Sequence, residues 1–448
     1  GYVMAGSVFD SALYNQLFPT GEVGRLFTDS AELRAMLLVE GTLAKVQGAQ
    51  GVIPESSAAA IARAAIEVQL DPGALAAATG QNGVSVPALV AAFRSEMQAP
   101  EHAQYVHWGA TSQDIIDTGL MLRLRQALTL IEVDLTTSIA ALADMADTYA
   151  EFPMPARTYG QHATPTSFGA VAASWGAPLL SLKQDLPLLR AQTLLVSLSG
   201  AAGTSGALGS MAAQTRADLA KALSLGDPKR SWHTDRTPLL KLSDWMTRLT
   251  AALGKIGEDL TEMAQTGIGE VTLGGAGSSS TMPQKQNPVG PSILVAIARQ
   301  VIGLHGVLQG AALPRYQRDG AAWFTEWMCL PQIVLGAASA VQTAVPLITG
   351  TQPVPRAMAA ALADGLDMIH AEALSFALTQ TMTRPEAQAA VKALCKEALT
   401  TTEPLRTLVA RDWPKLDVAT LFDPAQQLGL APQEARKFAA DARQISQA

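Results

Sequence analysis

The chain has 448 residues, of which 48% are hydrophobic and 16% charged, and its formal net charge is −7 at pH 7. So high an apolar share excludes a disordered chain, and an acidic balance is unlike the basic face of a nucleic-acid-binding protein. A chain of this length is expected to form two or three packed units. The low charged fraction suggests that much of the surface is covered by contacts between subunits.

The beginning of the chain predicts short helices, over 30–50 and 55–68. We assign residues 1–113 to an N-terminal helical domain. The first residues lack the basic and apolar regions of a signal peptide, so none is expected and a cytoplasmic location is favoured.

The centre of the chain predicts five long helices. In residues 119–151 apolar residues recur at steps of three and four, which places them on one face of a helix that ends before Pro153. These residues are Leu124, Leu128, Ile131, Leu135, Ile139, Leu142, Ala146 and Tyr149. Similar patterns cover residues 170–195, 239–265, 292–313 and 323–348. Alternation with period two is too short for a major sheet, so we expect an all-α fold whose central domain, 114–350, is an elongated helical bundle.

Residues 351–448 predict shorter helices and a C-terminal domain. Residues 327–355 contain no charged side chain, but they include Gln332 and Gln342 and lack basic flanks. We therefore expect a buried core helix and no membrane partner. A helix that is apolar on all sides needs neighbours on all sides, which again indicates an oligomer.

The chain has two cysteines, Cys329 and Cys395, too few for a disulfide framework or a zinc site. Cys329 lies in an apolar run, which is typical of a buried, unreactive thiol.

Three segments interrupt the helical pattern with small and polar residues. The first, residues 107–114 (HWGATSQD), precedes the first long helix. Thr111 and Asp114 have the spacing of a capping box, and this structural role is favoured when the segment is considered alone. The functional alternative is that Thr111 and Ser112, together with free amides at the helix start, bind an anion.

The second segment is residues 156–165 (ARTYGQHATP). Arg157 has a guanidinium that can fork onto a carboxylate, while Thr158 and Gln161 offer neutral donors. A polar loop whose donors satisfy its own backbone is an equally good interpretation. His162 stands alone, and a lone histidine is more often a structural residue than an acid or base.

The third segment is residues 274–288 (GGAGSSSTMPQKQNP). A flexible loop that ends in Lys285 and Asn287 is typical of a lid that closes over an anion. A plain Gly/Ser linker is the alternative, but a linker has no need of the Met-Pro-x-Lys-x-Asn-Pro ending. The segment also lacks the spacing of a nucleotide-binding P-loop.

The third segment resembles the signature loop of the fumarase/aspartase superfamily, usually written GSSxMPxKxNP, and the first two resemble that superfamily's other shared regions in the same order. Within the superfamily the chain is similar to the 3-carboxy-cis,cis-muconate cycloisomerases. The similar residues are 105–118, 161–165, 232–236, 323–327 and Arg318. Tyr159 stands where many superfamily lyases have histidine and these cycloisomerases have tryptophan. Gln286 stands where the cycloisomerases have arginine, and Tyr316 and Gln317 where they have His-Glu.

The resemblance implies a homotetramer with a twenty-helix core, composite active sites where three subunits meet, a small polycarboxylate substrate, and no metal or cofactor. Its shared chemistry removes a proton next to a carboxylate and gives a carbanion. Lys285 and Asn287 would polarise that carboxylate, and Ser279, six residues before the lysine and flanked by Ser278 and Ser280, would accept the proton. The implied substrate-binding residues are Thr111, Ser112, Arg157, Thr158, Gln161, His162, Asn287 and Arg318.

The activity that the resemblance implies is cycloisomerisation of 3-carboxy-cis,cis-muconate to its lactone. A lyase that releases fumarate from a substituted succinate by breaking a C–N or C–O bond is the main alternative. A catalytically silent structural homologue is the second, although such a role would not require Ser279, Lys285 and Asn287.

Overall fold

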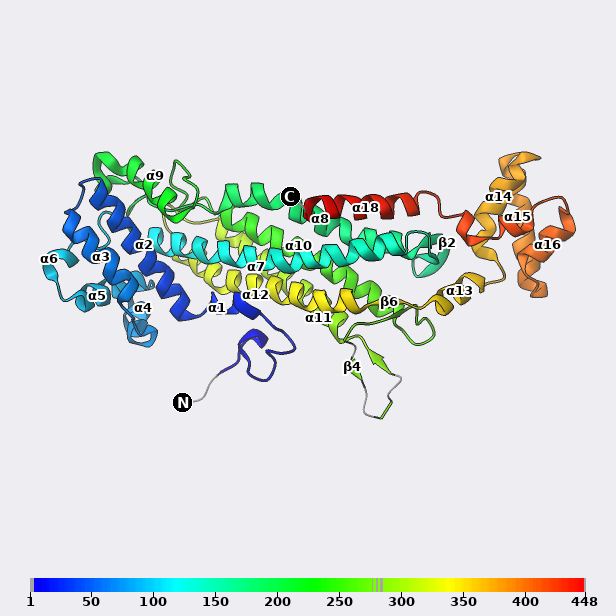
Figure 1. The fold of residues 1–448 in the computed structure, drawn as a ribbon, viewed down its shortest axis with the longest axis horizontal. Coiled ribbons are helices and arrows are strands. Elements are labelled where there is room, and N and C mark those ends of the chain that lie inside the picture. Colours follow the sequence, from blue (N-terminus) through cyan, green and yellow to red (C-terminus); the bar gives the residue numbers. More distant parts are fainter. Residues whose placement is uncertain (1–3, 276, 279–280, 283–284, 447–448) are drawn as a thin grey trace. The chain divides into compact units, whose positions relative to one another are not determined.

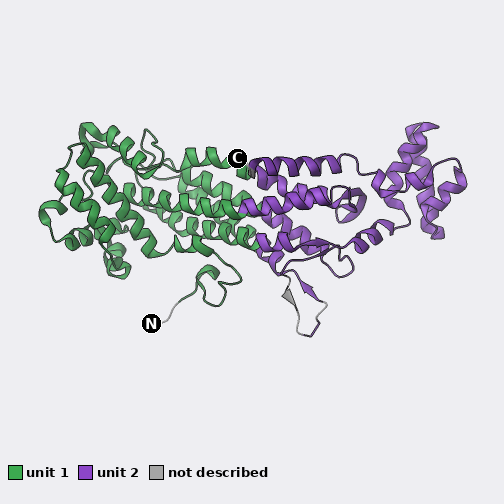
Figure 2. Ribbon diagram, viewed as in Figure 1, with its two compact units in different colours: residues 1–134, 182–251, 296–343 green, residues 135–181, 252–295, 344–448 purple. Residues whose placement is uncertain are grey.

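The computed structural model describes residues 4–275, 277–278, 281–282 and 285–446 (Figure 1). Its contacts divide the chain into two compact units (Figure 2). Unit 1 consists of Gly1–Asp134, Leu182–Ala251 and Ala296–Thr343, and unit 2 consists of Leu135–Ser181, Ala252–Val295 and Ala344–Ala448. Both units are mostly helical, as predicted. The proposed domains 1–113, 114–350 and 351–448 divide the chain at other places and stay a prediction.

The five long helices predicted for the centre of the chain are present. They are α7 (Ser112–Thr148), α8 (Phe168–Thr193), α10 (Thr237–Met263), α11 (Val289–Leu308) and α12 (Gly320–Gly350). Along α7, the predicted apolar positions from Leu124 to Ala146 are at most 1% exposed. The helix begins at Ser112, directly after Thr111, and Asp114 accepts a hydrogen bond from Thr111 N, as the predicted cap requires. Its first turns lie outside the apolar pattern because they bury the polar residues Gln113, Asp114 and Asp117.

Unit 1 begins with short helical elements. They are η1 (Val8–Asp10), α1 (Gly21–Arg25), α2 (Asp29–Ala49), α3 (Glu55–Glu67), η2 (Pro72–Leu75), α4 (Ala76–Asn82), α5 (Val86–Met97) and α6 (Pro100–Ala103). Later segments add η3 (Gly206–Met211), α9 (Ala212–Leu223) and η4 (Gln309–Ala312). Helices α2 and α3 pack closely at two glycines. A Cβ on Gly41 would lie 2.6 Å from Ala65 Cβ and one on Gly48 2.3 Å from Ala58 Cβ, so only glycine allows this approach.

Unit 2 contains a hairpin of β1 (Pro153–Thr158) and β2 (Gln161–Ser167), where the sequence suggested a polar loop. Tyr159 and Gly160 at its tip have φ of 55° and 73°, the positive values of a type I′ turn. The prolines at 153, 155 and 165 hid the strands from the sequence pattern. They are tolerated because a two-stranded sheet has only edge strands.

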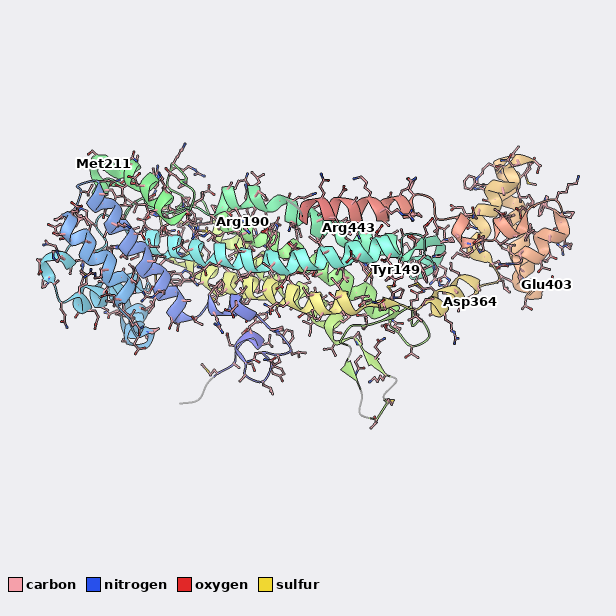
Figure 3. The ribbon with its side chains drawn as sticks, viewed as in Figure 1. Tyr149, Arg190, Met211, Asp364, Glu403 and Arg443 are labelled. Atoms are coloured by element: carbon pink, nitrogen blue, oxygen red, sulfur yellow. The ribbon has the colours of Figure 1, made fainter. Side chains whose placement is uncertain are left out.

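Two further strand pairs lie just before and within the third segment. The strand β3 (Val271–Thr272) pairs with β6 (Gln352–Pro353), and β4 (Gly277–Ser278) pairs with β5 (Gln286–Asn287). The remaining helices of unit 2 are α13 (Pro355–Ala363), α14 (Ala371–Ala377), η5 (Met368–His370), η6 (Leu378–Gln380), α15 (Arg384–Thr401), α16 (Leu405–Asp412), α17 (Val418–Leu421), η7 (Pro424–Gln426) and α18 (Ala431–Ser446). Arg443 on α18 is labelled in Figure 3. It binds Asp144 and Asp147 on α7, each at 3.1 Å.

Two apolar helical stretches, Val289–Ala312 and Gly320–Gly350, are long and apolar enough to cross a membrane by length and composition alone. The second is 67% buried within the chain, in agreement with the predicted core helix. It also buries Cys329, and burial raises the pKa of that thiol, as expected for an unreactive cysteine. In the first stretch only 39% of the most apolar 18-residue window is buried, so apolar side chains there are exposed.

Candidate functional site

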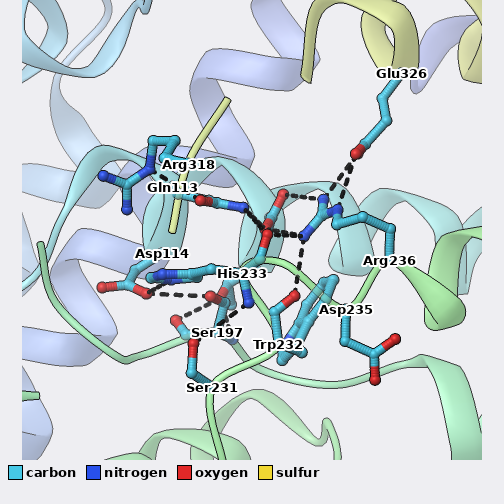
Figure 4. A network of polar contacts seen from close by, with 12 residues as sticks. Gln113, Asp114, Ser197, Ser231, Trp232, His233, Asp235, Arg236, Arg318 and Glu326 are labelled. Atoms are coloured by element: carbon cyan, nitrogen blue, oxygen red, sulfur yellow. Dashed lines mark hydrogen bonds and ion pairs between the residues drawn. The ribbon is translucent and has the colours of Figure 1, made fainter. Parts of the chain in front are cut away.

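The first segment leads into a buried polar network at the start of α7 (Figure 4). The carboxylate of Asp114 is wholly buried. Its partners are Thr111 N at 3.0 Å, Ser197 Oγ at 3.1 Å, Ser199 N at 2.9 Å, Gly200 N at 3.0 Å and His233 Nε2 at 2.7 Å. Burial alone would raise the pKa of this carboxyl, but the bonds from His233 and from backbone amides outweigh it and lower the pKa. Asp114 therefore stays ionised and holds the first segment against the chain around residue 200.

A second set of buried charges adjoins it. Arg236, 3% exposed, forks onto Asp117 at 3.0 and 3.1 Å and onto Glu326 at 2.8 Å through both oxygens. Burial lowers the pKa of this guanidinium, but the two carboxylates raise it well above its ordinary value. The same burial raises the pKa of Glu326, against the opposing effect of Arg236. One cation thus neutralises two carboxylates only in part.

Arg318, predicted to bind substrate, lies in unit 1 with the first segment. Its Nε donates to Gln113 Oε1 and its Nη1 to the carbonyl of Ala201, both at 3.0 Å. Among the described residues, no hydrogen bond involves the hydroxyl of Thr111 or Ser112, so both are available to a ligand. A cavity of about 10 Å³, enough for about one water molecule, is lined by Gln113, Arg318 and His233.

His107 adds a titratable group that sequence reasoning did not select. Its Nδ1 lies 2.8 Å from Oε2 of the buried Glu40. Burial lowers the pKa of the imidazole, but Glu40 outweighs it and the net pKa is raised. The partner comes from α2, 67 residues earlier, so no local pattern could have indicated the pair.

The second segment forms the tip of the β1–β2 hairpin in unit 2. Thr158 pairs with Gln161, and Arg157 with His162. Thr158, Gln161 and His162 are exposed, and the side chain of Tyr159 is fully exposed. Arg157 is not free: its Nη1 donates to Glu270 Oε2 at 3.0 Å and its Nη2 binds Oε1 of the same residue. The Glu270 side chain is 0% exposed, so the guanidinium is matched to a carboxylate of its own chain.

The third segment carries Lys285 and Asn287 on either side of Gln286. Lys285 is exposed and Asn287 half-buried. The Gln286 carboxamide accepts from Leu273 N at 2.8 Å and donates to the carbonyl of Val271 at 3.5 Å. It therefore acts as an extra strand partner for β3. Ser279 lies outside the described residues.

The predicted site residues fall into two groups. Thr111, Ser112 and Arg318 belong to unit 1. The other described members, Arg157, Thr158, Gln161, His162, Lys285 and Asn287, belong to unit 2. Within unit 2, the hairpin and the third segment are tied to the same stretch of chain, since Glu270 directly precedes β3.

Residues 19–303 match the model of a protein family described as lyase. The chain is 36% identical over 430 residues to 3-carboxy-cis,cis-muconate cycloisomerase of Pseudomonas aeruginosa, with 94% of each chain covered. It is also 36% identical over 445 residues to nitrosuccinate lyase of Streptomyces davaonensis, covering 95% of this chain and 94% of the other. The solved structure of 3-carboxy-cis,cis-muconate lactonizing enzyme from Pseudomonas putida superimposes with a TM-score of 0.91 at 33% identity, over 97% of this chain and 100% of that one. The chain therefore belongs to this lyase family and is an enzyme of the fumarase/aspartase superfamily.

Proposed function

We propose that this enzyme is a cytoplasmic, cofactor-independent cycloisomerase that converts 3-carboxy-cis,cis-muconate to its lactone. The observation that carries the proposal is the buried network in unit 1. The segments that resemble the cycloisomerases, residues 107–114, 232–236 and 323–327, meet there through Asp114, His233 and the fork of Arg236 onto Glu326. Sequence likeness to a cycloisomerase over 94% of the chain supports the same reading.

In the proposed reaction a carboxylate oxygen of the substrate adds to a double bond, and the carbon next to another carboxylate takes up a proton. Substrate and product are isomers when counted as free acids, so the ionised substrate takes up one proton as its carboxylate becomes part of the neutral lactone. Negative charge develops on the second carboxylate before protonation, where Lys285 and Asn287 stabilise it by hydrogen bonds and charge. Ser279 carries the proton, while Thr111, Ser112, Thr158, Gln161, His162 and Arg318 hold the remaining carboxylates.

Purified enzyme incubated with 3-carboxy-cis,cis-muconate should bleach the ultraviolet absorbance of the conjugated diene, because lactone formation removes one double bond of the pair. The product, identified by mass spectrometry, should have the mass of the substrate. An unchanged absorbance, with fumarate released from a substituted succinate instead, would refute the proposal.

A fumarate-releasing lyase is the second candidate, and the local charges favour it. Gln286 is neutral and bound to β3, and Arg157 is matched by Glu270, so neither offers a free cation to a tricarboxylate. A dicarboxylate such as nitrosuccinate needs fewer cations in the site. Its elimination would transfer the proton next to one carboxylate to the enzyme and release fumarate and nitrite, both measurable in the same screen. The likeness to a nitrosuccinate lyase supports testing it.

We also propose that the active unit is a homotetramer with composite sites. The tip of the hairpin, with a fully exposed Tyr159 in a left-handed conformation, is costly to hold in water and suits a contact with another copy. The exposed side chains of Ile302 and Val307 on α11, 52% and 58% exposed, need the same cover.

Mixing two inactive variants tests the composite site. Ser279→Ala and Thr158→Ala homotetramers, dissociated and reassembled together, should regain activity, because some sites then combine an intact serine from one subunit with an intact threonine from another. Reassembly of each variant alone is the control. A monomer in light scattering, or no regain in mixed tetramers, contradicts the proposal.

Arg157 was predicted to bind substrate, but its fork onto Glu270 favours a positioning role. The pair ties the hairpin that carries Thr158 and Gln161 to the chain that enters β3. Removing one member of a buried pair leaves the other charge uncompensated, at a cost of about 3–5 kcal/mol, whereas replacing both by apolar residues is often neutral.

Arg157→Met should therefore lower the melting temperature and the activity together, and Arg157→Met/Glu270→Met should restore much of both. Thermal unfolding and kcat and KM are measured for each. A double variant that regains stability while KM stays raised would show that Arg157 binds substrate directly.

A further inference from the structure

Unit 1 contains a cavity of about 570 Å³ that none of the predicted site residues lines. Its walls come from α2, η2, α4, α7 and α12. Its apolar surface includes Leu33, Met36, Leu75, Trp323 and Trp327. Cavities of this size accommodate small organic ligands. The cavity also contains charged groups, and they restrict which ligand it fits.

Arg123 is the cation of this cavity, and its own chain leaves it incompletely bonded. The residue is 9% exposed. Its Nη1 donates to the carbonyl of Leu26 at 3.2 Å, while Nη2 lies 4.0 Å from Glu32 Oε1, too far for a hydrogen bond. The buried Nε has no partner among the described residues. Burial lowers the pKa of this guanidinium despite the nearby Glu32. A bound carboxylate would supply the charge-assisted bonds that Arg123 lacks.

Negative charges line the same cavity. Asp117 and Glu326 line it but are both bound by Arg236. Asp29 and Glu32 contribute from the beginning of α2, and the Glu32 side chain is 42% exposed. A ligand with only a carboxylate would meet them as like charges, and a ligand with only a cation would meet Arg123. A ligand that carries an ammonium group next to its carboxylate satisfies both, and an apolar side chain on it would fill the space beside Trp323 and Trp327.

The cavity also adjoins the residues that hold Arg318. Trp323 and Glu326 line both this cavity and the small one beside Arg318. From Glu326 a continuous run of hydrogen bonds reaches Arg318 through side chains only (Figure 4). It passes from Glu326 to Arg236 at 2.8 Å, from Arg236 to Asp117 at 3.0 Å, from Asp117 to Gln113 at 3.2 Å and from Gln113 to Arg318 at 3.0 Å.

We propose that this cavity is a second binding site, for an α-amino acid with an apolar side chain, and that its occupancy changes how Arg318 binds substrate. The binding part stands on the cavity alone. The coupling part rests on the proposed function, in which Arg318 holds a substrate carboxylate.

Three ligands that share one ring test the binding part: L-phenylalanine, 2-phenylethylamine and 3-phenylpropionate, which are zwitterion, cation and anion. Calorimetry and protein tryptophan fluorescence follow the titration. Phenylalanine should bind and the other two should bind at least about tenfold more weakly, since each lacks one charge-assisted contact. Equal or tighter binding of either, or binding of none, overturns the proposal.

Variants locate the site. Arg123→Met and Glu32→Gln should each weaken phenylalanine binding by about tenfold or more. Glu32 is partly exposed, so its variant is expected to fold even if the arginine variant does not. Glu22→Gln, on an exposed residue of α1 outside the cavity, is the matched control and should bind as the unmodified enzyme does. If both cavity variants bind phenylalanine as tightly as the unmodified enzyme does, this site is excluded.

The coupling part has its own readout. Phenylalanine should change KM. The dissociation constants of phenylalanine and of substrate should each change by the same factor when the other ligand is bound, because coupling between two binding equilibria is reciprocal. If phenylalanine binds without any change in KM, the coupling part of the proposal is refuted and the binding part is retained. An enzyme inactive on every substrate tested still reports binding by calorimetry, so the two failures are distinguishable.

Discussion

Replacing Ser279 by alanine should lower kcat by a factor of about 10²–10⁴, the usual contribution of a positioned proton-transfer group. The hydroxyl is the proposed proton carrier, and alanine removes it without changing the charge of the loop. Because the hydroxyl is proposed to act in proton transfer and not in binding the substrate, the effect should appear in kcat more than in KM. Steady-state kinetics, with circular dichroism and light scattering to confirm fold and assembly, measure it.

The neighbouring serines are the matched controls. Ser278→Ala and Ser280→Ala change the same loop by one hydroxyl and should retain most of the activity. If one of them is inactive while Ser279→Ala turns over normally, the proton carrier is that neighbour and the register taken from the resemblance is wrong.

Replacing Arg236 by methionine should destabilise the fold by about 3–5 kcal/mol, the typical cost of leaving buried charge uncompensated. The substitution leaves the carboxylates of Asp117 and Glu326, which Arg236 now bridges, facing one another in a buried site. That is a large part of the 5–15 kcal/mol by which domains are commonly stable. Thermal and denaturant unfolding should show an early transition.

The loss should also depend on pH. Burial already raises the pKa of Glu326, and without Arg236 it should rise further. A raised pKa means that the folded protein binds a proton more tightly than the unfolded chain. The contribution of the Glu326 carboxyl to the free energy of unfolding is therefore fully present below the pKa of the unfolded chain. It is lost as pH rises through the pKa of the folded protein. The deficit of the variant should be smaller at mildly acidic than at neutral pH.

An exposed pair provides the comparison. Arg248 binds Asp244 one helical turn away with its side chain 70% exposed, and such pairs contribute about 0–1 kcal/mol. Arg248→Met should therefore unfold almost as the unmodified enzyme does. If both variants unfold alike, the buried fork does not stabilise the fold.

The long helices could be predicted from the sequence because their stability depends on apolar residues at regular spacing, and that spacing is visible locally. The apolar pattern did not extend to the first turns of α7, which bury hydrogen-bonded polar groups, but the spacing of Thr111 and Asp114 indicated where the helix begins. The hairpin was missed because its prolines are typical of loops. There the pairing of the two strands overrides the local pattern.

Among the candidate site residues, too, local motifs could be recognised in the sequence and distant partners could not. The segments around Thr111, Thr158 and Lys285 could be selected from motifs. Their partners could not, because Glu270 lies 113 residues from Arg157, and nothing near Glu270 in the sequence marks it as a counter-ion. In the structure Arg157 is one member of an internal pair with Glu270, and its role in binding substrate stays a prediction.

The carboxamide of Gln286 has a consequence for how this enzyme could have diverged from its relatives. Its oxygen and nitrogen serve the backbone of Leu273 and Val271, so the residue is part of the framework between β3 and β5. Exchanging it for arginine would add a charge and at the same time remove the acceptor for Leu273 N–H. An exchange of Gln286 for arginine would therefore need a second change that restores an acceptor for Leu273 N–H.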